Sequence, residues 1–218
     1  IGVAKWACGD QVAGLEAFAA ARRIWEQGGG LQGLAGAGLL LNIGFAKADR
    51  GDAAGALEAY EGAIKIYESL GGLETPNGAT LLSSVGVARG NLGDQEGALG
   101  AYARARLIRE RTKTLASPAG AVLLRNIGVS LAATGDSAGA LGAYDEAMQL
   151  REWLGTLHAP AGASLLVSIG DAKAELGDVS SALEVYGRAR RVHESVGTLR
   201  TTPAGKALLN RLSELGAM

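Results

Sequence analysis

Residues that form cross-links or bind metals are scarce in this sequence. Cys8 is the only cysteine among 218 residues, which excludes an intrachain disulfide and any zinc site built on cysteines. The two histidines, His158 and His193, stand 35 residues apart, and no His-x-x-x-His or Cys-x-x-Cys spacing occurs. We therefore expect no metal ion and no other cofactor, and we interpret Cys8 as a small buried hydrophobic residue.

The chain has almost no net charge, and it has few aromatic side chains. The formal net charge is −1, so there is no basic field that would attract nucleic acid or an anionic membrane. Aromatic residues make up 5% of the chain, whereas glycine occurs 34 times, which is roughly twice its usual share of ~7%. Since hydrophobic residues still amount to 48%, we expect a sizeable core of Leu, Ile, Val and Ala with closely packed backbones.

Membrane and targeting signals are missing too. The longest uncharged stretch, Gly28–Ala46, contains seven glycines together with Gln32 and Asn42, so we do not expect it to insert into a membrane. No signal-peptide pattern opens the chain, which starts in what later copies indicate is the middle of a helix. We expect the true N-terminus to be missing. The sequence does not decide the cellular compartment. The cytoplasm agrees with the lack of disulfides, and an organelle interior agrees with it if a targeting segment is missing from the N-terminus.

A repeat of 42 residues organises the whole chain. The pair Gly-Asp recurs with this spacing at Gly9-Asp10, Gly51-Asp52, Gly93-Asp94, Gly135-Asp136 and Gly177-Asp178. An aromatic residue follows each pair, at Phe18, Tyr60, Tyr102, Tyr144 and Tyr186. The predicted units are approximately 1–36, 37–78, 79–120, 121–162 and 163–204, followed by a capping helix over 205–218. Together they are expected to form a single domain over 1–218.

Each unit is predicted to be a pair of helices. Apolar residues at helical spacing indicate a first helix that ends at the Gly-Asp turn, where the glycine suits a left-handed residue and the aspartate suits the N-cap of the second helix. Arg106 and Glu110 stand four residues apart on the solvated side of the second helix, as do equivalent pairs in two other units. A loop that carries Pro76, Pro118 or Pro160 is expected to close the unit.

The repeat resembles the tetratricopeptide repeat family. The resemblance is carried by small and large residues in fixed order, namely Gly44 after Ile43, then Gly51, Ala56, Tyr60, Ala63 and Pro76. The period of 42 and the segment Ala98–Arg111 resemble the kinesin-light-chain variety of that family. The resemblance implies an all-α fold, a right-handed α-solenoid of about five helical hairpins plus a C-terminal capping helix.

Convergent catalytic groups are not apparent, and we expect the chain not to be an enzyme. The glycine-rich Gly28–Gly33 lacks the Gly-Lys-Ser/Thr that grips phosphate, so it is interpreted as a flexible loop. Carboxylates that occur once per repeat would lie ~10 Å apart, too far to share a calcium ion, so Asp10 to Asp178 are interpreted as helix caps. The glutamates from Glu26 to Glu194 are interpreted as a solvated face.

The family resemblance implies a groove lined by the first helices, which holds a protein or peptide partner. The candidate groove residues are Asn42, Phe45, Asp49, Ser84, Val87, Asn91, Arg125, Asn126, Val129, Ser168, Asp171 and Glu175. The resemblance gives Asn42 and Asn126 the role of bonding a peptide backbone, and Phe45 and Arg125 are candidate anchors. With so few cations in the groove, we do not expect it to capture the acidic tail of a chaperone.

Three alternatives stay open for this face. The first helices can form a solvated surface without a partner, and Phe45 can simply fill a gap between neighbouring repeats. The chain can also be a structural subunit of a larger complex that docks through its convex surface or its edges. The predicted function is therefore an adaptor or scaffold, with the assembly subunit as the alternative.

Overall fold

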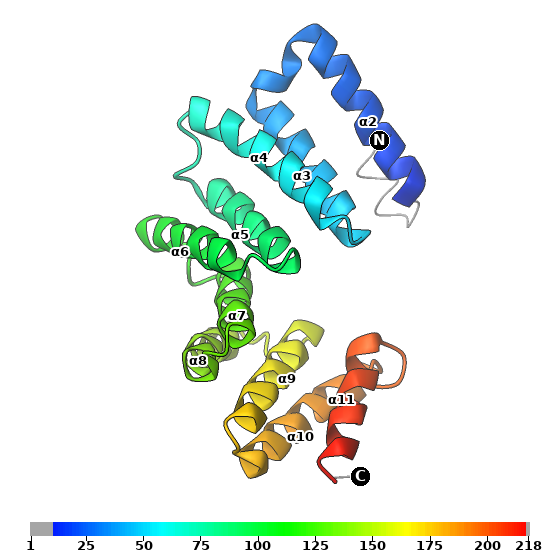
Figure 1. Ribbon diagram of the computed structural model, residues 1–218, viewed down its shortest axis with the longest axis vertical. Coiled ribbons are helices and arrows are strands. Elements are labelled where there is room, and N and C mark those ends of the chain that lie inside the picture. Colours follow the sequence, from blue (N-terminus) through cyan, green and yellow to red (C-terminus); the bar gives the residue numbers. More distant parts are fainter. Residues whose placement is uncertain (1–10, 217–218) are drawn as a thin grey trace. The chain divides into compact units, whose positions relative to one another are not determined.

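Helices form all the regular secondary structure in the computed structural model, which describes residues 11–216 (Figure 1). The chain divides into two compact units, Ile1–Lys113 and Thr114–Met218, each of which is described by itself. The first contains α2 (Gln11–Gly28), a short 3-10 helix (Gly30–Gln32), α3 (Leu34–Asp49), α4 (Ala53–Ser69), α5 (Pro76–Asn91) and α6 (Gln95–Arg111). The second contains α7 (Pro118–Ala133), α8 (Ser137–Trp153), α9 (Pro160–Glu175), α10 (Val179–Ser195) and α11 (Pro203–Glu214).

The Gly-Asp pairs form the turns between first and second helices. Gly51 has a φ of 79°, a left-handed conformation that ends α3, and the side chain of Asp52 accepts a hydrogen bond of 2.8 Å from the backbone N–H of Gly55 in α4. The same geometry recurs at Gly93, Gly135 and Gly177. The predicted caps are therefore confirmed for four repeats. The fifth pair, Gly9-Asp10, and the interpretation of Cys8 lie outside the described residues.

The prolines have a different place from the one predicted. Pro76 does not lie in the loop but is the first residue of α5, and the N-cap before it, Thr75, accepts a hydrogen bond from the backbone N–H of Gly78. Pro118, Pro160 and Pro203 likewise open α7, α9 and α11, although the N-cap of α9, Ala159, makes no side-chain hydrogen bond. The physical reason is that the first turn of a helix needs no N–H donor, and the fixed φ of proline already suits it.

Packing within each repeat depends on a tyrosine that faces a glycine. A Cβ atom added to Gly44 of α3 would lie 2.2 Å from Cε1 of Tyr60 in α4, so only glycine lets the two helices approach this closely. The same relationship holds at Gly86 with Tyr102 and at Gly170 with Tyr186. Around these pairs the core consists of alanine and of branched aliphatic residues, most of them almost completely buried. The core predicted from composition is confirmed.

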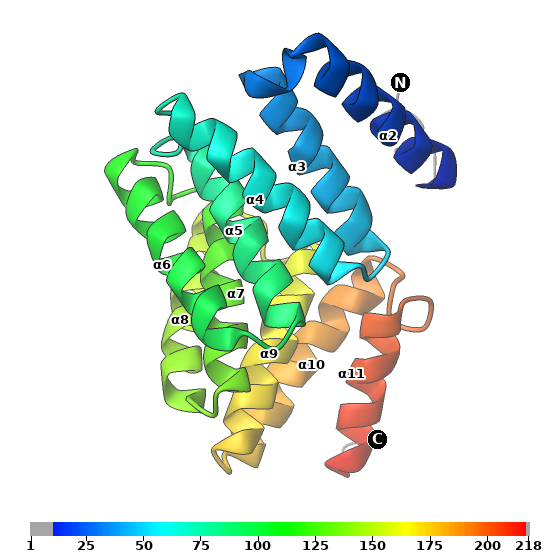
Figure 2. The same cartoon turned by 45° about the horizontal axis from the view of Figure 1, so that its top comes forward.

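Consecutive helices are paired throughout both units. In the first unit α3 packs on α4 and α5 packs on α6, and in the second α7 packs on α8 and α9 packs on α10 (Figures 1 and 2). Helix α11 follows as a single first helix without a second helix after it in the described part of the chain, and it buries Leu208 and Leu212. The all-helical fold of stacked hairpins is confirmed. The single domain over 1–218 stays a prediction.

Candidate functional site

All but one of the predicted groove residues occupy three equivalent positions on the first helices; the exception, Arg125, stands one residue before Asn126. Asn42, Ser84, Asn126 and Ser168 share one position; Phe45, Val87, Val129 and Asp171 share the next turn; Asp49, Asn91 and Glu175 share the last turn. One of these positions presents apolar side chains to solvent: Phe45 is 40% exposed and Val129 is 41% exposed. Such side chains on one face are available for contact with another molecule.

In the first unit, Phe45 both packs inside the repeat and exposes apolar surface, as the gap-filling role and the anchor role respectively require. Its ring contacts the ring of Tyr60 edge-on, with the centroids 5.8 Å apart and an interplanar angle of 68°. The rest of the ring is exposed. Phe45 therefore extends the core of its hairpin outward and still offers an apolar surface. Nearby, Asn42 lines a cavity of about 540 Å³ between α3 and α5, whereas Asp49, Ser84, Val87 and Asn91 lie outside that lining.

The serines of the predicted groove contribute mainly to the packing of the repeats. Ser84 donates to the backbone carbonyl of Thr80 at 3.1 Å, and Ser168 donates to that of Ser164 at 3.1 Å. Ser84 and Ser168 also act on Tyr60 and Tyr144 of the preceding second helices, where each serine lowers the pKa of the tyrosine against the larger increase caused by burial. These hydroxyls are therefore occupied within the protein, which the sequence pattern alone did not indicate.

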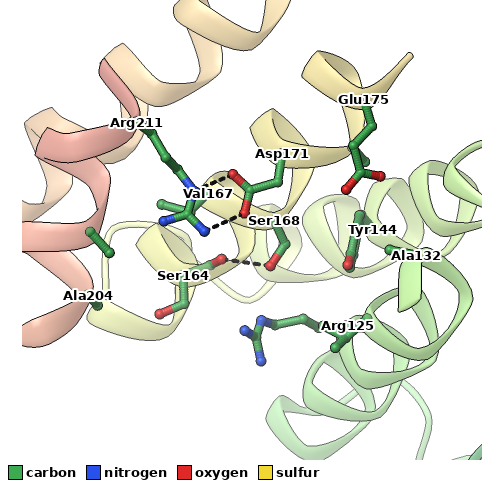
Figure 3. A pocket seen from close by; sticks show the side chains of 13 residues that line it. Arg125, Ala132, Tyr144, Ser164, Val167, Ser168, Asp171, Glu175, Ala204 and Arg211 are labelled. Carbon is green, nitrogen blue, oxygen red and sulfur yellow. Dashed lines mark hydrogen bonds and ion pairs between the residues drawn. The ribbon is translucent and has the colours of Figure 1, made fainter. Parts of the chain in front are cut away.

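In the second unit, five of the predicted residues come together around one cavity. Arg125, Val129, Ser168, Asp171 and Glu175 line a space of about 410 Å³ between α7, α9 and α11 (Figure 3). Alanines and valines form the remainder of its wall, among them Ala132, Val167, Ala172, Ala204 and Ala207. The sixth predicted residue of this unit, Asn126, is partly buried and does not belong to the lining.

Both carboxylates of this cavity are held by neighbouring side chains. Asp171 accepts hydrogen bonds from Arg211 of α11 at 2.5 Å and 2.9 Å (Figure 3). It also accepts a hydrogen bond from the hydroxyl of Tyr186 at 2.6 Å. Burial, followed by this hydrogen bond to Asp171, raises the pKa of Tyr186. Glu175 accepts a hydrogen bond of 2.7 Å from Ser137. The acidic groups are thus part of a network that joins α8, α9, α10 and α11.

Arg125 differs from the other polar residues of the cavity. Its Nε atom is buried and has no hydrogen-bond partner, and no carboxylate among the described residues forms an ion pair with it. Its guanidinium group points into the cavity (Figure 3). Burial raises the pKa of Tyr144 beside it, and the charge of Arg125 acts against that increase. The cavity therefore contains one cation whose charge is not balanced by a neighbouring carboxylate.

Sequence reasoning missed Arg211 and Arg151. Arg211 occupies the repeat position of Ser168, but an extra residue before Pro203 moves it out of the 42-residue spacing. Arg151 lies on a second helix and resembles the arginines of the solvated side, yet it is 4% exposed. In the described part of the chain no three His, Cys, Asp or Glu residues are grouped as metal ligands, and no helix there has the length and apolar character needed to cross a bilayer.

The paired helices and their sequence pattern can be compared with those of known proteins. Residues 37–77 match the tetratricopeptide repeat family. The chain is similar to the crystal structure of BtubC (BKLC) from P. vanneervenii, with 24% identity and a TM-score of 0.67 over 77% of this chain, which spans 66% of that protein. A putative kinesin light chain of Podosopora anserina with nearly identical TPR-like repeats gives a TM-score of 0.74 at 13% identity, covering 90% of this chain and 92% of that one.

A third solved structure, MamA, gives a TM-score of 0.62 at 17% identity and covers 93% of both chains. No curated protein sequence matches this chain. The fold is that of an array of helical hairpins. Residues 37–77 are a tetratricopeptide repeat, and the fold is that of the TPR-like repeats of kinesin light chains. The resemblance indicated by the sequence is confirmed.

Proposed function

We propose that this chain is a non-enzymatic scaffold that holds a segment of another protein against its first helices. The observation that supports this most directly is the cavity of the second unit, where Val129, Val167 and small alanines lie beside the guanidinium group of Arg125. A surface that combines exposed apolar side chains with a few polar groups is typical of protein recognition. The tetratricopeptide repeat family generally mediates contacts between proteins, which agrees with this proposal.

The polar groups of the cavity support binding rather than catalysis. Asp171 and Glu175 already accept hydrogen bonds from Arg211, Tyr186 and Ser137, which leaves neither carboxylate poised as a base beside a nucleophile. Ser168 donates to a carbonyl of its own helix. A catalytic site would need a nucleophile and a base within hydrogen-bond distance of each other and of a substrate.

A second candidate function is that of a subunit that docks in a larger complex through the opposite helices. Trp153, near the end of α8, is 74% exposed, and Leu107 on α6 is 45% exposed. Large exposed apolar side chains of this kind often mark interfaces between proteins. Because both residues lie on second helices, this mode uses a different surface from the first-helix face.

A pair of variants in the second unit separates the two functions. Val129→Arg places a charge on the first-helix face, and Trp153→Arg places the same charge on a second helix, at a site that is also exposed. The scaffold proposal expects Val129→Arg to lose the proteins that wild type retains in affinity purification, while Trp153→Arg keeps them. The reverse result favours the subunit. Melting temperatures close to that of wild type confirm that both variants are folded.

A further inference from the structure

Buried polar atoms without partners gather in one hairpin of the second unit. Among the described residues, five buried side-chain polar atoms lack a hydrogen-bond partner, and three of them belong to the hairpin of α7 and α8 and its following loop. They are Nε of Arg125, Nε of Arg151 and Oγ1 of Thr156. Thr156 is also tied to Arg151 through the backbone, since its N–H donates to the carbonyl of Arg151 at 2.8 Å.

Comparison with the preceding repeat explains why Arg151 lacks an acceptor. The equivalent residue, Arg109 of α6, donates through Nη2 to the hydroxyl of Thr80 in α5 at 2.9 Å. In the hairpin of α7 and α8 the residue equivalent to Thr80 is Val122, which has no hydroxyl group. One turn further along α7 stands Arg125, which is a second donor instead of an acceptor.

The two arginines act on each other electrostatically. Burial and the charge of Arg125 lower the pKa of Arg151, and Arg151 is 4% exposed. A buried guanidinium group stays charged and destabilises the folded state unless an anion or several acceptors surround it. The nearest carboxylates of the cavity, Asp171 and Glu175, are held by Arg211, Tyr186 and Ser137. The positive charge of Arg125 therefore faces whatever occupies the cavity.

We propose that Arg125, supported from behind by Arg151, binds the carboxylate of an aspartate or glutamate side chain in the partner segment. This rests on the proposed function and names the chemistry of its occupant. Arg125 faces the cavity and makes the contact, and Arg151 raises the positive potential without neutralising it. Val129, Val167 and Ala132 line the same cavity as Arg125, and apolar side chains suit the short aliphatic stem of an acidic side chain. A guanidinium group and a carboxylate form paired, charge-assisted hydrogen bonds.

The test uses random 12-residue peptides displayed on phage and selected on the wild-type chain. The proposal expects the selected peptides to share an acidic residue at one position. Arg125→Gln is expected to weaken binding of a selected peptide by about 10- to 100-fold, the range for a lost hydrogen bond to a charged group. The same peptide with glutamine at that position should bind wild type and Arg125→Gln equally.

Arg151→Met distinguishes a supporting charge from a merely structural residue. We expect this variant to bind the selected peptide more weakly and to melt at a higher temperature than wild type, because it removes a buried cation without an acceptor. Arg109→Met is the matched control in the first unit: it breaks the bond to Thr80, so it should melt at a lower temperature with unchanged peptide affinity. An Arg151→Met variant with lower stability and wild-type affinity contradicts the proposal.

Three other results would overturn this inference in distinguishable ways. If peptides are selected but show no acidic position, the acidic subsite is wrong while the scaffold function stands. If sodium sulfate raises the melting temperature of wild type but not of Arg125→Gln at matched ionic strength, and peptides show no acidic preference, the site binds a free inorganic anion. If no peptide is selected by any variant, the proposed function itself fails for short segments.

Discussion

A Cβ atom placed on Gly128 would lie 2.4 Å from Cε1 of Tyr144, so the tyrosine ring of α8 occupies the place of any side chain on α7 at this position. The relationship joins the two helices of one hairpin and recurs in the described repeats at intervals of 42 residues. The close approach of the helices therefore depends on both members of the pair, a large ring and a missing side chain.

The first prediction follows from this pair. Gly128→Ala should destabilise the chain by about 1–3 kcal/mol, because overpacking forces the ring or the helices to move. Gly142→Ala on α8 is the matched control, since nothing lies within 4 Å of its Cβ position; it should stabilise by about 0.5–1 kcal/mol through helix propensity. Urea unfolding of both variants tests this, and equal stabilities would contradict the packing account.

The second prediction concerns alkaline pH. Burial, then the charge of Asp49, raises the pKa of Tyr60 to about 12, from an ordinary value of 10.0. The unfolded chain therefore loses this proton first as the pH rises. The contribution of Tyr60 to stability is fully present below pH 10 and is lost between pH 10 and 12, by on the order of 2 kcal/mol. Denaturant unfolding between pH 9 and 12 should show a shallower decline for Tyr60→Phe than for wild type, and identical slopes would count against it.

The third prediction concerns the end of α6. Lys113 has a φ of 55°, the left-handed conformation that glycine adopts at the equivalent sites Gly71, Gly155 and Gly197. Lys113→Gly should stabilise the chain by about 1 kcal/mol by removing this strain. Gly155→Ala is the converse control and should destabilise by a similar amount. Thermal melts of the two variants should therefore shift in opposite directions, and a lower melting temperature for Lys113→Gly would be inconsistent with strain.

The fourth prediction tests how α11 is attached. Asp171→Asn removes the charge that pairs with Arg211, so α11 should open more often, and its backbone amides should exchange hydrogen faster than in wild type. The loss should be about 1 kcal/mol, since both side chains are about a third exposed. Asp145→Asn, on the exposed side of α8, is the control and should leave exchange in α11 unchanged. Equal exchange in all three proteins would show that apolar packing alone holds the helix.

The helical hairpins could be predicted from the sequence because the residues that determine them are close together in the chain and recur at a fixed period. Gly51 and Asp52 form a helix stop and a helix start with backbone geometry that few other residues suit, and Tyr60 recurs in step with them. The prolines were misplaced because proline both fails to continue one helix and favours the start of the next. Only the second role is used here, as Pro76 shows.

The candidate site was predicted less completely, because the role of a polar side chain depends on its neighbours from other repeats. Asp171 and Ser168 were expected to face a partner, yet Asp171 accepts hydrogen bonds from Arg211 and Tyr186, and Ser168 donates to a carbonyl of its own helix. Arg151 resembles a solvated residue in the sequence and is buried in the structure. Helical periodicity gives the face on which a residue stands, but it does not give the hydrogen bonds that residue makes.

Site-specific photo-crosslinking tests the central claim most directly. A benzophenone side chain introduced at Val129 samples the first-helix face of the second unit, and the same group at Trp153 samples a second helix at a more exposed site. The account predicts a crosslinked protein partner at Val129, lost when Arg125→Gln is combined with it, and little product at Trp153. Crosslinking to the same partner at Trp153 and none at Val129 would contradict it.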